Sequence, residues 1–186
     1  MLMQSKPNVL LLYPKTGMDF GSTVAPPHAL LTIAAPVIMA GYNVTILDQR
    51  VQLIDDDVLK ELISSDLICI GISTMTGTQI KFALGLAHQA RRVTGGNVPL
   101  VWGGCHPSVM AEQTAEHENV DIVVNGEGDE TFLELLQALE KKEPLGNIRG
   151  LVYKDGGEMV NTGNRELLDV EGLLPVPWDL VNVENY

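Results

Sequence analysis

The sequence predicts an α/β fold in which helices cover both faces of a parallel sheet. Five short apolar runs alternate with longer segments of helical pattern. The runs are apolar at nearly every position, which is typical of parallel strands buried on both faces. These runs are residues 8–13, 43–48, 66–72, 98–102 and 121–125. Five strand–helix units of this length fit a doubly wound, flavodoxin-like (Rossmann-like) sheet with the strand order 2-1-3-4-5.

The segments between the strands carry helix start and stop signals. Pro27 suits a first turn and Gly41 a helix end, while Pro36 predicts a kink or a break in between. Gly95-Gly96 ends the third helix near Thr94. The predicted helices cover residues 27–41, 55–65, 78–94, 108–118 and 129–142.

The pattern changes after Pro144. Residues 148–153 and 158–161 predict a β-hairpin around the glycine-containing turn 154–157. Residues 162–186 show no period and predict an extended tail or linker. We therefore divide the chain into a sheet domain, residues 1–145, and a hairpin with a linker, residues 146–186.

Length and composition limit the function. The chain has 186 residues and 45% hydrophobic residues, enough for one domain with a proper core. Its net charge of −12 argues against binding to nucleic acid or to anionic membranes. No apolar stretch is long enough to span a membrane, and no signal peptide is evident. With only two cysteines, Cys69 and Cys105, we expect a cytoplasmic protein without disulfides.

Glycines and hydroxyl residues follow four of the five predicted strands. In an open α/β sheet, ligands bind beyond the carboxyl ends of the strands, and glycines there let a ligand lie against the backbone. The candidate ligand-binding residues are Ser73, Thr74, Thr76, Gly103, Gly104, His106, Gly126, Glu127 and Gly128. A simpler interpretation stays open, because such loops need glycine and threonine for turns and caps. Thr76 or Thr78 then caps a helix, and Asp129 and Glu130 complement the next helix N-terminus.

The sequence lacks the motifs of several common cofactor and metal sites. The loop after residues 8–13 has no Gly-x-Gly-x-x-Gly, which argues against a dinucleotide fold. Residues 74–78 resemble a flavodoxin phosphate loop, but they follow the third strand rather than the first. The four histidines show no metal-ligand spacing, and two isolated cysteines make no zinc site. His106 alone falls firmly on the predicted ligand edge, with His28 close to it.

Taken together, these motifs resemble the cobalamin (B12)-binding domain at the N-terminus of B12-dependent radical SAM enzymes. The similarity covers nearly the whole chain. It is carried by the proline-rich loop after the first strand, Gly71-Ile-Ser-Thr74, Gly103-Gly-Cys-His-Pro107, Asn125-Gly-Glu-Gly-Asp-Glu-Thr-Phe132, Ile148-Arg-Gly-Leu-Val-Tyr153 and Leu174-Pro-Val-Pro-Trp-Asp-Leu180.

The resemblance implies that the corrin lies on the carboxyl edge of the sheet, with its nucleotide tail beside the third and fourth strands. The backbone at Gly103-Gly104 would then touch the tail, and Ser73 and Thr74 would hydrogen-bond it. Residues 126–128 would border its sugar or base.

Two family features are missing from the sequence. The Asp-x-His-x-x-Gly motif, which supplies the lower cobalt ligand in some relatives, does not follow the first strand. The Cys-x-x-x-Cys-x-x-Cys signature of the [4Fe-4S] cluster is also absent. The chain is therefore expected to be a non-catalytic fragment, with S-adenosylmethionine and the cluster bound by a C-terminal radical SAM domain that it lacks.

The hypothesis is thus a cobalamin-binding module. The parent enzyme would transfer a methyl group or close a ring by radical chemistry, as in tetrapyrrole cyclisation. One alternative is a flavodoxin-like electron-transfer domain that binds FMN. A second is a vestigial docking domain that binds no cofactor.

Overall fold

The computed structural model describes residues 7–17, 24–63 and 66–186. Its strands form a single sheet with the order β2-β1-β3-β4-β5-β6-β7. They are β1 (Asn8–Tyr13), β2 (Asn43–Asp48), β3 (Leu67–Ser73), β4 (Leu100–Gly103), β5 (Ile122–Val124), β6 (Leu151–Asp155) and β7 (Glu158–Asn161). The first five strands are parallel, which confirms the predicted order 2-1-3-4-5.

The predicted hairpin is present but belongs to the same sheet. β6 pairs antiparallel with β5, and β7 pairs with β6 around Gly156-Gly157. The sheet therefore has seven strands rather than five. The proposed boundary at residue 145 falls within one continuous sheet, because Val124 pairs with Leu151 across it.

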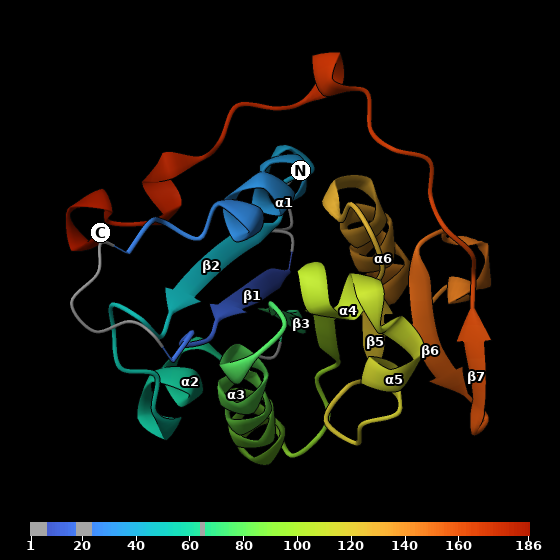
Figure 1. The fold of residues 1–186 in the computed structure, drawn as a ribbon, viewed down its shortest axis with the longest axis horizontal. Helices are drawn as coiled ribbons and strands as arrows, with labels where there is room; N and C mark the ends of the chain where they lie inside the picture. Colours follow the sequence, from blue (N-terminus) through green and yellow to red (C-terminus); the bar gives the residue numbers. More distant parts are fainter. Residues whose placement is uncertain (1–6, 18–23, 64–65) are drawn as a thin grey trace, which may run out of the picture.

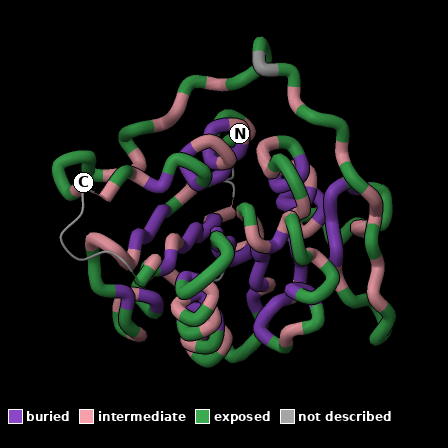
Figure 2. Tube along the Cα trace, in the orientation of Figure 1, coloured by how far each residue is buried: buried purple, intermediate pink, exposed green. Residues whose placement is uncertain are grey.

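Helices cover both faces of the sheet (Figure 1). They are α1 (His28–Met39), α2 (Asp56–Leu62), α3 (Thr78–Thr94), α4 (Cys105–Val109), α5 (Ala111–Ala115) and α6 (Asp129–Lys141). α1 and α6 lie on one face, and α2, α3 and α5 on the other. Successive residues of one strand point to opposite faces, so Val9 and Leu11 join the core under α1 and α6. Leu10 and Leu12 join the core on the α3 side. Figure 2 shows the strands as the buried centre of the molecule.

Helix ends follow the sequence signals in most places. Gly95 adopts the left-handed conformation that ends α3. Pro36 does not break α1, which continues to Met39. The expected helix over residues 108–118 is wrong in its bounds, because Met110 leaves helical geometry and separates α4 from α5. The expected end of α2 at Ser65 lies outside the described residues.

The start of α2 is capped by an acidic side chain, as predicted, and a single substitution tests this role. The Asp55 carboxylate accepts hydrogen bonds from the backbone N–H groups of Asp57 and Val58, at 3.1 and 3.0 Å. Loss of such a cap costs about 1 kcal/mol, so we expect Asp55→Ala to lower the free energy of unfolding by this amount in urea denaturation. Asp57→Ala is the control, because the exposed Asp57 carboxylate pairs with Lys60, whereas Asp55 is the residue that caps α2. Equal losses in both variants would contradict the capping role.

Residues 162–186, named the strap here, run from β7 across the α1 and α6 side of the sheet to the end of β2 (Figure 1, orange to red). Arg165 ties the strap to α6, where it binds the Thr131 hydroxyl and the carboxylates of Glu130 and Glu134. Val176, Leu180 and Val181 pack against the core under α1. The strap is extended, as expected, but it packs back onto the sheet domain.

Candidate functional site

A cleft of about 190 Å³ lies between α1 and α6, at the carboxyl ends of β3, β4 and β5. Ala29 and Ile33 of α1 form one wall, and Asp129 and Phe132 of α6 form the other. Because parallel strands end at the same edge of the sheet, the loops after three of them meet in this cleft.

Five of the predicted site residues line the cleft. They are Ser73, Gly103, Gly104, Gly126 and Gly128. Gly103 ends β4 opposite Ser73 of β3. Among the described residues, a Cβ atom at Gly103 would meet only Val124, at 3.9 Å. Neither backbone strain nor crowding by residues that the structure describes therefore requires glycine at position 103, and its missing side chain leaves free space in the cleft.

Gly104 is a glycine for a different reason. Its φ is +97°, and a Cβ atom there would lie 2.7 Å from the Thr74 carbonyl oxygen and 3.0 Å from the Thr74 nitrogen. The backbone after β4 thus runs directly against the backbone after β3. Gly104 is needed for this contact whatever occupies the cleft.

The other four predicted residues lie at the same sheet edge but do not line the cleft. Thr74 is fully buried; its N–H donates to the Gly103 carbonyl, and its own carbonyl accepts from the His106 N–H. The Thr76 hydroxyl and His106 Nδ1 are 3.4 Å apart. The Glu127 carboxylate accepts the Leu168 N–H of the strap at 2.7 Å. Binding roles for these four residues stay predictions.

The capping role considered for Thr76 and Thr78 is wrong. The residue before α3 is Gly77, and no side chain caps this helix through its N-cap position. Gln79 instead holds the loop, because its side chain accepts from the Met75 N–H and donates to the Pro14 carbonyl. The first turn of α6 does begin with Asp129 and Glu130, as predicted.

The helix walls were missed by the sequence reasoning. α1 was treated only as a helix, although its apolar residues occupy every face, which is typical of a helix with partners on several sides. That pattern could have indicated that Ala29 and Ile33 border the cleft while other residues of α1 pack in the core. Asp129 was assigned only to the start of α6, yet it also lines the cleft.

Asp129 is the only ionisable residue among those lining the cleft. Burial raises the pKa of its carboxyl group, and the charges of Glu127 and Glu130 raise it further, whereas a hydrogen bond from its own N–H lowers it. The cleft is otherwise mostly apolar, so it suits a flat apolar group that also carries a few polar atoms.

A buried ion pair lies at the same edge, beyond the end of β2. Arg50 binds the Asp48 carboxylate at 2.6 Å, covers the Tyr13 ring at 4.2 Å and donates to the Ala25 carbonyl. The Tyr186 hydroxyl donates to the same carboxylate at 3.0 Å. Burial and the negative charge of Asp48 raise the pKa of Tyr186. This cluster joins Tyr13 at the end of β1, Ala25 just before α1 and Tyr186 at the end of the strap.

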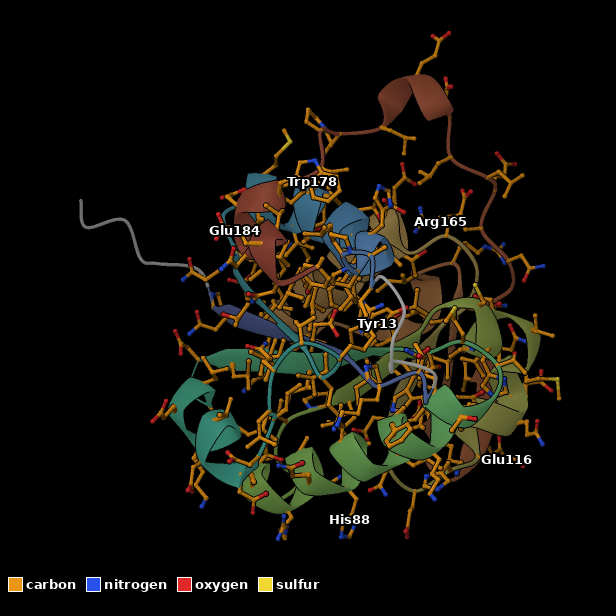
Figure 3. The ribbon with its side chains drawn as sticks, turned by 60° about the vertical axis from the view of Figure 1, so that its left-hand side comes forward. Tyr13, His88, Glu116, Arg165, Trp178 and Glu184 are labelled. Atoms are coloured by element: carbon orange, nitrogen blue, oxygen red, sulfur yellow. The ribbon has the colours of Figure 1, made fainter. Side chains whose placement is uncertain are left out.

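The remaining histidines lie away from the cleft lining. The His28 ring lies 6.1 Å from the Trp178 ring of the strap, and His88 projects from the outer side of α3 (Figure 3). Within the described ranges, no three His, Cys, Asp or Glu side chains are placed to hold a metal ion. None of the described helices combines the length and apolar character needed to cross a membrane.

Residues 22–136 match the B12 binding domain family. The chain belongs to this family. The matched segment runs from the loop after β1 to α6, so it contains both walls of the cleft. The resemblance predicted from the glycine motifs is therefore confirmed.

Curated relatives extend the similarity to nearly the whole B12-binding chain. An uncharacterized methyltransferase of Pyrococcus horikoshii is 32% identical over 96% of this chain. The anaerobic magnesium-protoporphyrin IX monomethyl ester cyclase of Synechocystis is 27% identical over 94% of it. The chain spans only 39% and 35% of these two proteins.

Solved structures share the fold of this B12-binding domain. The radical S-adenosylmethionine methyltransferase TsrM of Kitasatospora setae, with cobalamin and a [4Fe-4S] cluster bound, superposes with a TM-score of 0.73 over 92% of this chain and 31% of TsrM. The cobalamin-dependent radical enzyme OxsB gives 0.70 over 87% of this chain and 23% of OxsB. Both are 22% identical to it in sequence.

Proposed function

We propose that this domain holds cobalamin at the carboxyl edge of its sheet, with the nucleotide arm of the cofactor in the cleft between α1 and α6. The observation that carries this proposal is the cleft floor at Gly103, where a side chain is absent although the backbone would accept one. A ligand that needs this space explains the glycine, and the fold alone does not.

The residues present fit such a group. Leu11, Ile33 and Phe132 offer apolar contacts to a flat ring, and Ser73 places a hydroxyl at the end of β3 in the same cleft. Nearby, Thr74 Oγ1 is the one buried side-chain oxygen or nitrogen among the described residues without a hydrogen-bond partner. An unpaired buried hydroxyl is costly. Thr74 follows Ser73 at this edge of the sheet but does not line the cleft, so a hydrogen bond from its hydroxyl to the ligand stays a prediction.

When bound, cobalamin supplies a cobalt centre that carries a methyl group or takes part in radical chemistry. The chain's own residues position the cofactor and exclude water from its arm. Residues 14–27 contain no histidine, so we propose that no imidazole from the loop after β1 binds the cobalt.

We further propose that the domain belongs to a B12-dependent radical SAM enzyme that transfers methyl groups or closes rings. S-adenosylmethionine and the [4Fe-4S] cluster would then bind to a C-terminal partner domain, with residues 146–186 leading toward it. Support comes from longer relatives, of which this chain spans 35% and 39%, and which are a cyclase and an uncharacterized methyltransferase. Both cysteines are free thiols, in keeping with the proposed cytoplasmic location.

The test is a titration with hydroxocobalamin followed by absorbance, using the wild type and Gly103→Val. We expect the valine side chain to occupy the cleft and to raise the Kd about tenfold or more, because each 1.4 kcal/mol of lost contact costs a factor of ten. The thermal midpoint should change little, since strands favour valine and the space is free.

Gly85→Val is the matched control. Gly85 lies on the exposed side of α3, where a Cβ atom would meet nothing within 4 Å. Wild-type affinity in Gly103→Val would refute the assigned cleft. If the wild type bound FMN and left hydroxocobalamin unbound, the flavodoxin alternative would replace the proposal.

A further inference from the structure

Three polar side chains face an otherwise apolar cleft: Thr32, Ser73 and Asp129. The Thr32 hydroxyl already donates to the Ala29 carbonyl at 3.1 Å. Ser73 can donate or accept, whereas an ionised carboxyl group at Asp129 can only accept hydrogen bonds. A ligand group that lies against an ionised Asp129 carboxylate must therefore offer a hydrogen-bond donor.

Asp129 differs from its acidic neighbours in its partners. The Glu127 carboxylate accepts a hydrogen bond from the Leu168 N–H, and the Glu130 carboxylate pairs with Arg165 at 2.9 Å. Leu168 and Arg165 both belong to the strap. Among the described residues Asp129 forms no ion pair within 4.0 Å. A ligand that fills the cleft displaces water from the Asp129 carboxyl group, which costs desolvation free energy. A hydrogen-bond donor on the ligand offsets this cost.

We propose that Asp129 is a specificity-determining residue, whose carboxylate accepts a hydrogen bond from the nucleotide arm of a corrinoid. This inference rests on the proposed function. The donor is a ribose hydroxyl, present in every corrinoid with a ribonucleotide arm, or an exocyclic amine, present when the base is adenine. The domain thus selects complete corrinoids over cobinamide, which has no nucleotide arm.

The same carboxylate constrains how the arm lies. Its negative charge repels the phosphodiester of the arm, an effect that is strong at short range in a cleft of low dielectric. We therefore expect a sugar or base group of the arm, rather than its phosphate, to approach Asp129. Gly128 keeps this approach open on the α6 side, because a Cβ atom there would lie only 3.2 Å from Ile33 and would narrow the cleft.

The experiment measures the Kd of the wild type and of Asp129→Ala for hydroxocobalamin, for its adenine-containing analogue and for cobinamide. We expect the alanine variant to lose about tenfold in affinity for hydroxocobalamin, the size of a hydrogen bond to a charged group, and nothing for cobinamide. A loss shared by both complete corrinoids identifies the ribose hydroxyl. A loss confined to the adenine analogue identifies the amine.

Two results would overturn the inference and leave the proposed function standing. One is unchanged affinity for both complete corrinoids, and the other is an equal loss for all three ligands. Failure of the wild type to bind any of them would instead refute the proposed function. Asp57→Ala is the control for removing an acidic residue from a first helical turn, because exposed Asp57 of α2 lies outside the cleft.

If Asp129→Ala does not fold, Asp129→Asn tests the same role, because it keeps the shape of the side chain. Asp129→Asn retains a hydrogen-bond acceptor at the start of α6 but lacks the charge, and bonds to neutral acceptors are weaker. For each complete corrinoid that loses affinity in Asp129→Ala, the preference over cobinamide must then fall by a smaller factor in Asp129→Asn. An unchanged preference in this variant would count against the role of the carboxylate.

Discussion

Replacing Gly104 with alanine is expected to lower the free energy of unfolding by about 3 kcal/mol or more. The single added methyl group would lie 2.7 Å from the Thr74 carbonyl oxygen and 3.0 Å from its nitrogen. The φ of +97° and ψ of −173° at Gly104 lie in a region that is essentially restricted to glycine, so any residue with a Cβ atom adds strain of about 1–3 kcal/mol. Because the neighbours are backbone atoms held by strand pairing, they cannot move aside cheaply. Urea denaturation measures the loss.

Gly126→Ala separates the two causes. Gly126 also has a positive φ, +89°, but a Cβ atom there would meet nothing within 4 Å. We expect this variant to lose only the strain contribution. Equal losses at the two positions would show that the close approach of the loops after β3 and β4 contributes nothing. The contrast also explains why Gly103, and not Gly104, is the position at which to test ligand binding.

Arg50→Met is expected to destabilise the fold by about 3 kcal/mol, the lower end of the range for removing one partner of a buried ion pair. The Asp48 side chain is 2% exposed and its Arg50 partner 9%, so the carboxylate would remain buried without its cation. The backbone N–H of residue 50 and the Tyr186 hydroxyl still donate to it. These remaining bonds keep the expected loss at the lower end.

Arg92→Met is the matched control for Arg50→Met. Arg92 pairs with Asp56 at 2.7 Å, but the two side chains are 60% and 33% exposed. Exposed pairs contribute at most about 1 kcal/mol. Chemical denaturation of both variants should therefore differ by about 2 kcal/mol, and similar values would mean that solvent screens Asp48 as well.

The sequence predicted the parallel sheet, its strand order and the loops that meet at the cleft. These features depend on local patterns: apolar runs, the glycines that follow them, and the fixed handedness of strand–helix–strand units. Ser73, Gly103 and Gly128 were identified because the carboxyl ends of parallel strands must share one edge. The hairpin was also recognised, since its turn is formed by neighbouring residues.

What the sequence did not reveal depends on contacts between distant segments. No local pattern in residues 148–161 indicates that β6 pairs with β5. Asp129 begins α6 and also lines the cleft, and the second role depends on α1, which forms the opposite wall. The Asp48–Arg50–Tyr186 cluster joins residues 138 positions apart. Likewise, Thr76 or Thr78 was considered as the cap of α3, but Gln79 forms the hydrogen bonds that hold this loop.

The strap has a consequence for how the molecule opens. It leaves the sheet at β7, one edge strand, and is fixed beside β2, the other edge strand, by Tyr186. The contact between Tyr186 and Asp48 joins residues 138 positions apart, and closing a long loop of chain costs more conformational entropy than closing a short one. We therefore expect the strap to become ordered late in folding. The strap should then detach in sub-global fluctuations that leave the sheet intact, and its amide protons should exchange with solvent before those of β1 and β3.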